Sequence, residues 1–164
     1  MGSLQLSKLY VDEIEPKTNA FPVEVSTPFF LLHENAATSV GSTATLMDNW
    51  DVIADNYSGF SGSTYTIPQN CGGVWIFLLR VSILGVANGG WSYSALKKNG
   101  TIDPLTETWS ACHVTNFPRN NSHMISLSSG DTLQMYISQS NGTQNTDYSS
   151  RKSIFSGYRL GNLT

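Results

Sequence analysis

The chain has little charge, and this shortage argues against partners that carry dense negative charge. Charged residues make up 13% of the 164 positions, the net charge is −3, and the nine basic residues are scattered along the chain. Average domains carry roughly 25% charged residues. Because no basic stripe or patch is visible, we expect neither a nucleic-acid partner nor attraction to an anionic membrane surface.

Long apolar runs and cysteines are also few. The longest apolar run, VWIFLL at 74–79, is far shorter than the roughly 20 residues of a membrane-spanning helix, and the N-terminus lacks the apolar segment of a signal peptide, so we expect a soluble chain without membrane insertion. Cys71 and Cys112 lack metal-ligand spacing. Two buried thiols are favoured over a single disulfide, which the sequence leaves open.

Signatures of catalysis are missing as well. The three histidines, His33, His113 and His123, show no metal-binding spacing, and GFSGS at 59–63 does not fit the nucleophile-elbow pattern of hydrolases. No acid is flanked by a catalytic motif. We therefore expect no enzymatic activity and no cofactor.

One acidic cluster is a weak candidate for a metal site. Asp48, Asp51 and Asp55 fall within eight residues, and clustered carboxylates can bind calcium, although no EF-hand register is present. A solvated loop explains such a cluster equally simply. No other metal site is expected.

Small polar residues are what the chain has in abundance, with 22 Ser, 15 Thr and 13 Asn. Such a composition favours short strands and turns over surface helices. Alternation of apolar and polar residues predicts an all-β domain of about eight to ten strands in a two-sheet sandwich or jelly roll. The segments expected to hold strands are 28–35, 43–50, 57–68, 72–84, 91–102, 104–121, 154–161 and the pair that flanks the turn at 128–131.

The first residues differ from the remainder. Residues 1–26 contain two short alternating stretches around EPKTN, with too few apolar positions for a core of their own. We predict an N-terminal β arm or connector over 1–26, which lies on the main domain or pairs with copies of itself, and a single head domain over 27–164.

The strand predicted at 72–84 is apolar on both sides. Trp75, Phe77 and Leu79 alternate with Val74, Ile76 and Leu78, whereas one face of an antiparallel sheet is usually polar. One face fits the opposite sheet of the sandwich. The second face predicts self-association, because burying each aliphatic side chain is worth roughly 1.5–3 kcal/mol. Cover by a long loop or by the N-terminal arm is the alternative.

Four motifs occur in an order that resembles one family. CGGVWIF (71–77) is similar to the Gly-x-Tyr-x-Phe strand of the tumour necrosis factor-like, complement globular-head jelly roll, with Trp75 in place of the usual Tyr. ALKKNG (95–100), ISLSSGDTLQMYI (125–137) and FSGYRL (155–160) resemble its later strands and turns. The resemblance implies a ten-stranded jelly roll that forms a compact homotrimer.

Residues for the trimer interface follow from the doubly apolar strand and from this resemblance. The pattern nominates Val74, Ile76 and Leu78, and the resemblance adds Tyr136 and Tyr158. An aromatic residue such as Tyr136, on the face opposite Leu133, suits a subunit contact, and an exposed Tyr is the alternative.

The resemblance also implies that both chain termini share one end of the trimer, so that distal loops face outward. Aromatic rings beside amides and hydroxyls suit carbohydrate or protein recognition, although Trp91 and Trp109 are equally suited to core packing. The candidates for receptor contact are Trp91, Trp109, Arg119, Asn120, His123 and Tyr148.

The segment LYVDEIEPKTNAFPVEV (9–25) is similar to connector segments of tailed-phage and other viral fibres, and collagen-like repeats are absent. We therefore predict a trimeric virion surface protein, a fibre knob or head decoration, that attaches to a host-surface glycan or protein and contacts other virion proteins through its arm. The alternatives are a secreted, complement-head-like recognition protein and a capsid cement protein without a receptor.

Overall fold

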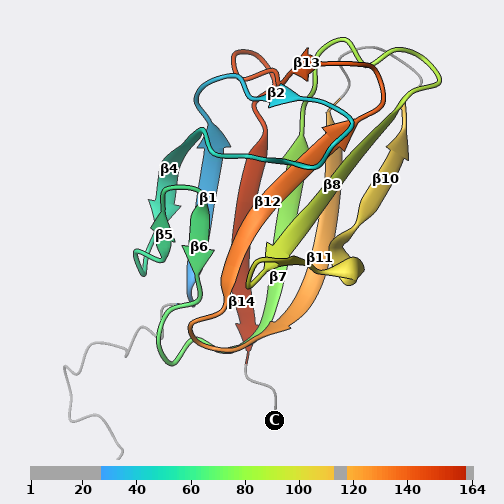
Figure 1. The fold of residues 1–164 in the computed structure, drawn as a ribbon. Coiled ribbons are helices and arrows are strands. Elements are labelled where there is room, and N and C mark those ends of the chain that lie inside the picture. The colour runs from blue at the N-terminus through green and yellow to red at the C-terminus, as the bar shows by residue number, and fades with distance from the viewer. Residues whose placement is uncertain (1–26, 113–117, 162–164) are drawn as a thin grey trace, which may run out of the picture.

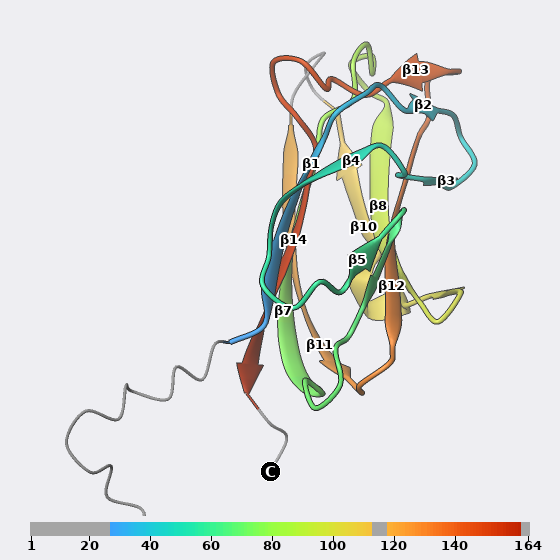
Figure 2. The ribbon, with the colours of Figure 1, turned by 90° about the vertical axis from the view of Figure 1, so that its left-hand side faces the viewer.

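Two β-sheets pack face to face in a sandwich (Figures 1 and 2). The computed structural model describes residues 27–112 and 118–161, so the predicted arm over 1–26 and His113 lie outside the described residues. The first sheet has the strand order β11, β7, β14, β1, β4. These strands are β11 (Arg119–Leu127), β7 (Gly73–Val81), β14 (Ile154–Gly161), β1 (Phe29–Glu34) and β4 (Trp50–Asp55).

The second sheet has the order β10, β8, β12, β6, β5. These strands are β10 (Thr108–Ala111), β8 (Trp91–Lys98), β12 (Thr132–Gln139), β6 (Thr64–Thr66) and β5 (Phe60–Ser61). β3 (Thr45–Leu46) pairs with β12 and β9 (Thr101–Ile102) with β8, while β2 (Ser39–Val40) pairs with β13 (Gln144–Asn145). The helical element in the described residues is the 3₁₀ turn η1 (Pro104–Thr106), and no described helix is long and apolar enough to cross a membrane.

The all-β prediction is confirmed, with ten strands on the main paths of the two large sheets. The expectation of one strand over 43–50 is wrong. The segment forms the two-residue β3, and the next strand, β4, begins only at Trp50. A short irregular stretch separates them, across which the Trp50 indole N–H donates to the Met47 carbonyl oxygen at 2.9 Å. Cys71 and Cys112 are free, buried thiols.

The core consists of the inward-facing residues of both sheets, with aromatic rings at its centre. Phe30 stacks on Tyr65 with ring centroids 3.9 Å apart, and Phe155 meets Phe30 edge-on at 4.9 Å. Trp75 and Phe77 of β7 are fully buried beside them. The alternation in β7 therefore places its aromatic side between the sheets, where these large rings supply much of the apolar burial.

Two glycines of the resembling motifs allow the strands of the first sheet to approach closely. Gly73 has φ of 135°, and a Cβ at this position would lie 2.1 Å from the Gly161 carbonyl oxygen. A Cβ on Gly157 would lie 2.6 Å from the Phe77 ring. The two motifs thus depend on each other, because the glycine of one lies against the strand that carries the other.

The Asn-Gly and Gly-Asp turns also contact each other. Asn99 Nδ2 donates to Asp131 Oδ1 at 2.7 Å, and Lys98 Nζ lies 2.9 Å from Asp131 Oδ2. The Ser128 backbone N–H donates to the same carboxylate at 2.8 Å. Burial alone would raise the pKa of Asp131, but these hydrogen bonds outweigh it and lower the pKa below its usual value.

Asp131→Asn is therefore expected to reduce the free energy of unfolding at pH 7 by about 1–2 kcal/mol, because a charged acceptor of three donors is lost. Since the folded pKa is lowered, the wild-type advantage is present above the unfolded pKa and disappears as the pH falls through the folded pKa. Urea denaturation at pH 3–7 measures this. Asp48→Asn, at an exposed loop position, is the control and should change stability by less than about 0.5 kcal/mol.

A buried polar cluster ties β1 to the loops at the opposite end of the sandwich. The Glu34 carboxyl is fully buried and accepts a hydrogen bond from the Thr146 hydroxyl, and the Glu34 N–H donates to the Ser153 carbonyl oxygen at 3.0 Å. Thr38 N–H donates to Thr146 Oγ1 at 2.7 Å. Burial raises the pKa of Glu34, although the hydrogen bonds from Thr146, Ser153 and Thr38 oppose the shift.

A carboxyl group with a raised pKa holds its proton more tightly in the folded state, so stability is greatest below the unfolded pKa and falls as the pH rises through the folded pKa. Glu34→Gln is expected to remove this fall, which for one group reaches at most about 1.4 kcal/mol per pH unit. Thermal unfolding followed by circular dichroism at pH 4–8 measures it. Glu107→Gln, at an exposed position, should keep the wild-type slope, and an unchanged slope in Glu34→Gln would contradict the assignment.

Candidate binding surfaces

The outer side of the first sheet carries a continuous apolar face. Strand register places Met124, Ile76, Tyr158 and Phe29 in one row across β11, β7, β14 and β1. In the next row, Leu78 and Leu31 alternate with Ser122 and Ser156. We call this surface the apolar face; it consists of Phe29, Leu31, Val74, Ile76, Leu78, Met124 and Tyr158.

Much of this apolar face is open to solvent in the single chain. Met124 is 62% exposed, Leu78 47% and Tyr158 41%, whereas Val74 and Ile76 are half-buried. The second side of β7 is therefore apolar, as predicted, and no loop among the described residues closes over Leu78. This excludes a described loop as the cover and leaves another polypeptide segment or another subunit.

A hollow of about 520 Å³ lies at one end of the apolar face, with walls of Leu31, Leu78 and Ile154. Arg80, Asn120, Ser122 and Ser156 add polar groups to its lining. Within the described residues the side chain of Arg80 makes no ion pair, and its buried Nε atom has no hydrogen-bond partner. A surface that covers the hollow without an acceptor would remove water from the rest of this guanidinium at a cost in free energy.

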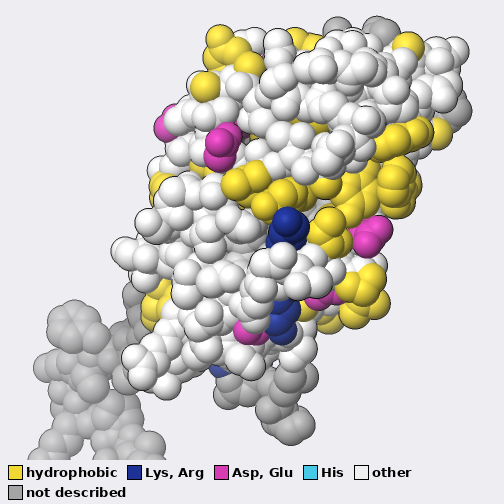
Figure 3. Space-filling model, viewed as in Figure 1, with side chains coloured by type: hydrophobic (Ala, Val, Ile, Leu, Met, Phe, Trp, Pro, Cys, Tyr) yellow, Lys and Arg dark blue, Asp and Glu magenta, His cyan; other side chains and the backbone are white. Residues whose placement is uncertain are grey.

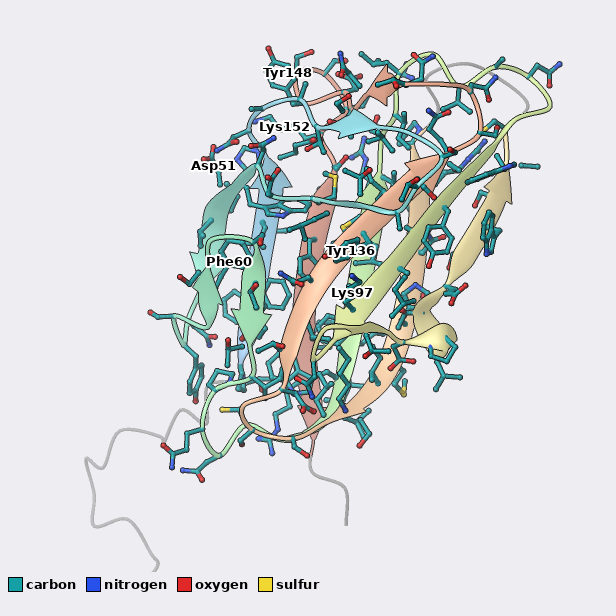
Figure 4. The ribbon with its side chains drawn as sticks, viewed as in Figure 1. Asp51, Phe60, Lys97, Tyr136, Tyr148 and Lys152 are labelled. Atoms are coloured by element: carbon teal, nitrogen blue, oxygen red, sulfur yellow. The ribbon has the colours of Figure 1, made fainter. Side chains whose placement is uncertain are left out.

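Tyr136 does not join the other four predicted interface residues. It lies in β12 of the second sheet, opposite Ala95, while Val74, Ile76, Leu78 and Tyr158 belong to the first sheet. Its ring points away from the core formed by Leu133 and Met135, as the alternation requires, and Lys97 Nζ lies 4.1 Å above its centroid (Figure 4). The resemblance identified the strand, but the two sheets turn these tyrosines to opposite sides of the sandwich.

Trp91 and Trp109 meet on the outer side of the second sheet. Trp109 pairs with Tyr93 across β10 and β8, and its ring centroid lies 4.7 Å from that of Trp91 and 4.8 Å from that of Tyr93. We call Trp91, Tyr93 and Trp109 the aromatic cluster. Figure 3 shows this side, where hydrophobic side chains form a band across β12, β8 and β10. Core packing is thus excluded for Trp109, which is 60% exposed.

The remaining receptor candidates do not form one site. Arg119 and His123 point between the sheets, on the same side of β11 as buried Ile125, and Arg119 Nη2 donates to the Ala111 carbonyl oxygen at 2.9 Å. Asn120 lines the hollow of the first sheet. Tyr148 is 45% exposed in a loop at the distal end, opposite the described chain ends (Figure 4). The prediction treated Arg119, Asn120 and His123 together as outward-facing contacts, whereas β11 begins at Arg119 and alternates its side chains.

His123 is half-buried on the inner side of β11, which is an edge strand of the first sheet. Burial lowers the pKa of His123, and this effect outweighs its hydrogen bond with the backbone of Leu105 and the nearby charge of Asp103, which both raise it. Its Nε2 atom is buried without a hydrogen-bond partner among the described residues. The imidazole is therefore a packed edge residue and not an exposed contact.

The three aspartates proposed as a weak calcium site do not converge. Asp51 accepts from Asn35 Nδ2 at 2.7 Å and lies 3.6 Å from His33 Nε2, while Asp55 accepts from the Phe60 N–H at 2.8 Å. Among the described residues, no group of three or more His, Cys, Asp or Glu side chains is placed to hold a metal ion. Asp51 and Asp55 lie at opposite ends of β4 and have different partners, so spacing in the sequence was misleading here.

The domain has the fold of a tumour necrosis factor-like jelly roll, with two five-strand paths packed face to face. Murine APRIL at pH 8.5 is similar with 15% identity and a TM-score of 0.61, over 82% of this chain and 99% of that chain. Eiger TNF from S. frugiperda has 15% identity and a TM-score of 0.62, over 84% and 95%.

The globular domain of zebrafish complement 1qA has the same fold, with 15% identity and a TM-score of 0.58 over 83% of this chain and 99% of that chain. Neither a family model nor a curated protein matches the sequence. At these identities the comparisons establish the fold, and the resemblance that the four motifs indicated is confirmed at that level.

Sequence reasoning missed Met124, Phe29 and Tyr93. Met124 stands between Ser122 and Ser126 on the outer side of β11, so its strand looks polar on that side. Phe29 sits in the run FFLL, where the sequence does not show which ring faces out. Tyr93 could have been found, because it follows Trp91 at the two-residue spacing that puts both on one side of a strand.

Proposed function

We propose that the chain is a non-enzymatic homotrimeric recognition head that binds a host-surface glycan or protein from the surface of a virion. The apolar face of the first sheet carries this proposal. Contiguous exposed apolar surface of this kind marks interaction sites, and covering each of its aliphatic side chains is worth roughly 1.5–3 kcal/mol.

A second and third copy are the cover that best fits the apolar face. The four motifs resemble a family of trimeric jelly rolls, and in a closed ring the apolar face of each copy would pack against a different surface of its neighbour. The described ends of the chain support such a ring. β1 pairs with β14 so that Phe29 lies beside Tyr158, and both ends leave the sandwich at the same end (Figure 1).

The virion location rests on the segment at 9–25, which resembles fibre connectors and lies outside the described residues. If that arm joins the particle, the distal loops point outward. Three weak sites on one rigid head then raise avidity without new contacts. The fold suits a secreted, complement-head-like recognition protein equally well, and a cement protein would bind only its own particle.

Leu78→Glu is expected to convert the trimer to a monomer, because it places on the apolar face a carboxylate that would lose its hydration in the contact. Light scattering coupled to size-exclusion chromatography at micromolar concentration measures the mass. Leu84→Glu is a matched control, since Leu84 is 36% exposed but lies outside this face.

We expect the control to remain a trimer and Leu78→Glu to keep the far-ultraviolet spectrum of a folded β protein. A monomeric wild-type chain would refute the proposed assembly. A trimeric Leu78→Glu variant would show that another surface holds the copies together.

Binding to host cells should depend on assembly. The trimer is expected to bind cells at least about 100-fold more tightly than the Leu78→Glu monomer, because linked sites bind with a high effective concentration. Flow cytometry with labelled protein measures this, with Leu84→Glu as the trimeric control. Equal binding by monomer and trimer would argue against multivalent attachment, and binding to purified particles alone would favour the cement role.

A further inference from the structure

We propose that the aromatic cluster of Trp91, Tyr93 and Trp109, together with Glu107, is a shallow binding site for an uncharged pyranose sugar. This inference deepens the recognition role proposed above by naming the ligand class and the residues that bind it. The site lies on the second sheet, away from the apolar face, so that assembly through the first sheet leaves it accessible.

The backbone fixes the rings in place. Trp109 lies directly opposite Tyr93 in the β10–β8 pair, and Trp91 lies opposite Ala111 two residues further along. Tyr93 is buried to 6% exposure and forms the floor, while the Trp109 ring leans on both neighbours at interplanar angles of 54° and 60°. A ring that is supported on its inner side yet 60% exposed offers a rigid apolar surface at little entropic cost.

A carboxylate lies next to this surface. Glu107 is exposed and precedes Trp109 by two residues in extended backbone, so both side chains project from the same side of the edge strand. The pKa of Tyr93 is raised by burial first and then by the charge of Glu107, which agrees with a short separation between the two groups. Glu107 makes no ion pair within the described residues, so its oxygens are available to accept hydroxyl groups.

This combination matches a sugar ring better than other ligands. A pyranose has an apolar C–H face that packs on an indole ring and hydroxyls that donate in pairs to a carboxylate. One largely exposed Trp gives far less area than the roughly 800 Å² per partner of a stable protein interface. An acidic sugar would be repelled by Glu107, while Lys97 lies over the Tyr136 ring at 4.1 Å and Arg119 donates to the Ala111 carbonyl oxygen from the inner side of the sandwich.

The position of the cluster suits an outward-facing contact. β8 starts and β10 ends near the distal end, while β1 starts and β14 ends at the opposite end (Figure 1). A sugar bound at Trp91 and Trp109 would therefore lie on the side of the head, away from the end at which β1 starts and β14 ends. Each of three copies would carry one such site.

Tryptophan fluorescence reports directly on this site. Trp75 is fully buried and Trp50 is 9% exposed, so iodide quenching acts mainly on Trp91 and Trp109. We expect neutral hexoses or their oligosaccharides to protect the full-length protein from quenching. On an array of immobilised neutral and sialylated glycans, binding should be confined to neutral sugars.

Trp109→Ala is expected to weaken binding at least about tenfold, and Trp109→Phe, which keeps a smaller ring in place, should lose less. Glu107→Gln should also weaken binding, because a neutral amide is the poorer acceptor for paired hydroxyls. Tyr57→Ala, which removes an exposed ring after β4 of the first sheet, is the matched control and should bind as wild type does.

The inference is overturned if no neutral glycan binds or protects, if Trp109→Phe and Trp109→Ala bind as wild type does, or if only a protein receptor binds through these residues. Failure of the sugar site can be distinguished from failure of the proposed trimer. A monomer that binds sugar through Trp109 would refute the trimer and support the site, whereas a trimer without sugar binding would refute the site alone.

Discussion

The structure depends on one strand whose two sides are both apolar. The inner side of β7 places Trp75, Phe77 and Leu79 between the sheets, where they are almost completely buried. The outer side presents Ile76 and Leu78 at the centre of an otherwise exposed face. In a jelly roll, the second sheet covers only the inner side of the first. The strand that supplies the core therefore also leaves an apolar outer side that only another polypeptide segment or subunit can cover.

The two outer faces of the sandwich differ in chemistry, and this difference suits one face to assembly and the other to recognition. The first sheet has aliphatic rows and a hollow with the guanidinium of Arg80, a combination that suits a covered contact. The second sheet has small residues such as Ala95 around a few aromatic rings, with Glu107 and Lys97 beside them. Assembly and recognition can therefore coexist, because neither requires the surface that the other uses.

Most of the fold could be predicted from the sequence, because alternation and turn residues are local signals. The strands at 28–35, 72–84, 91–102 and 154–161 follow from period two, and the two glycine-containing turns follow from their residue types. The candidate binding residues were harder to predict, because their positions depend on which sheet each strand joins. Tyr136 and Tyr158 look equivalent in sequence but face opposite sides, and the sequence does not show that His123 points inward from β11. Such distinctions arise from long-range pairing, which spacing along one strand does not encode.

The pairing of β1 with β14 determines how the domain would respond to mechanical load. Tension applied at residue 27 and resisted at the distal end acts along β1, which lies between β14 and β4 with hydrogen bonds to both. Those bonds run perpendicular to the strands in an antiparallel ladder, so the pull shears many of them at once and does not unzip them singly. A head built in this way would keep its shape while a tether at that end is stretched.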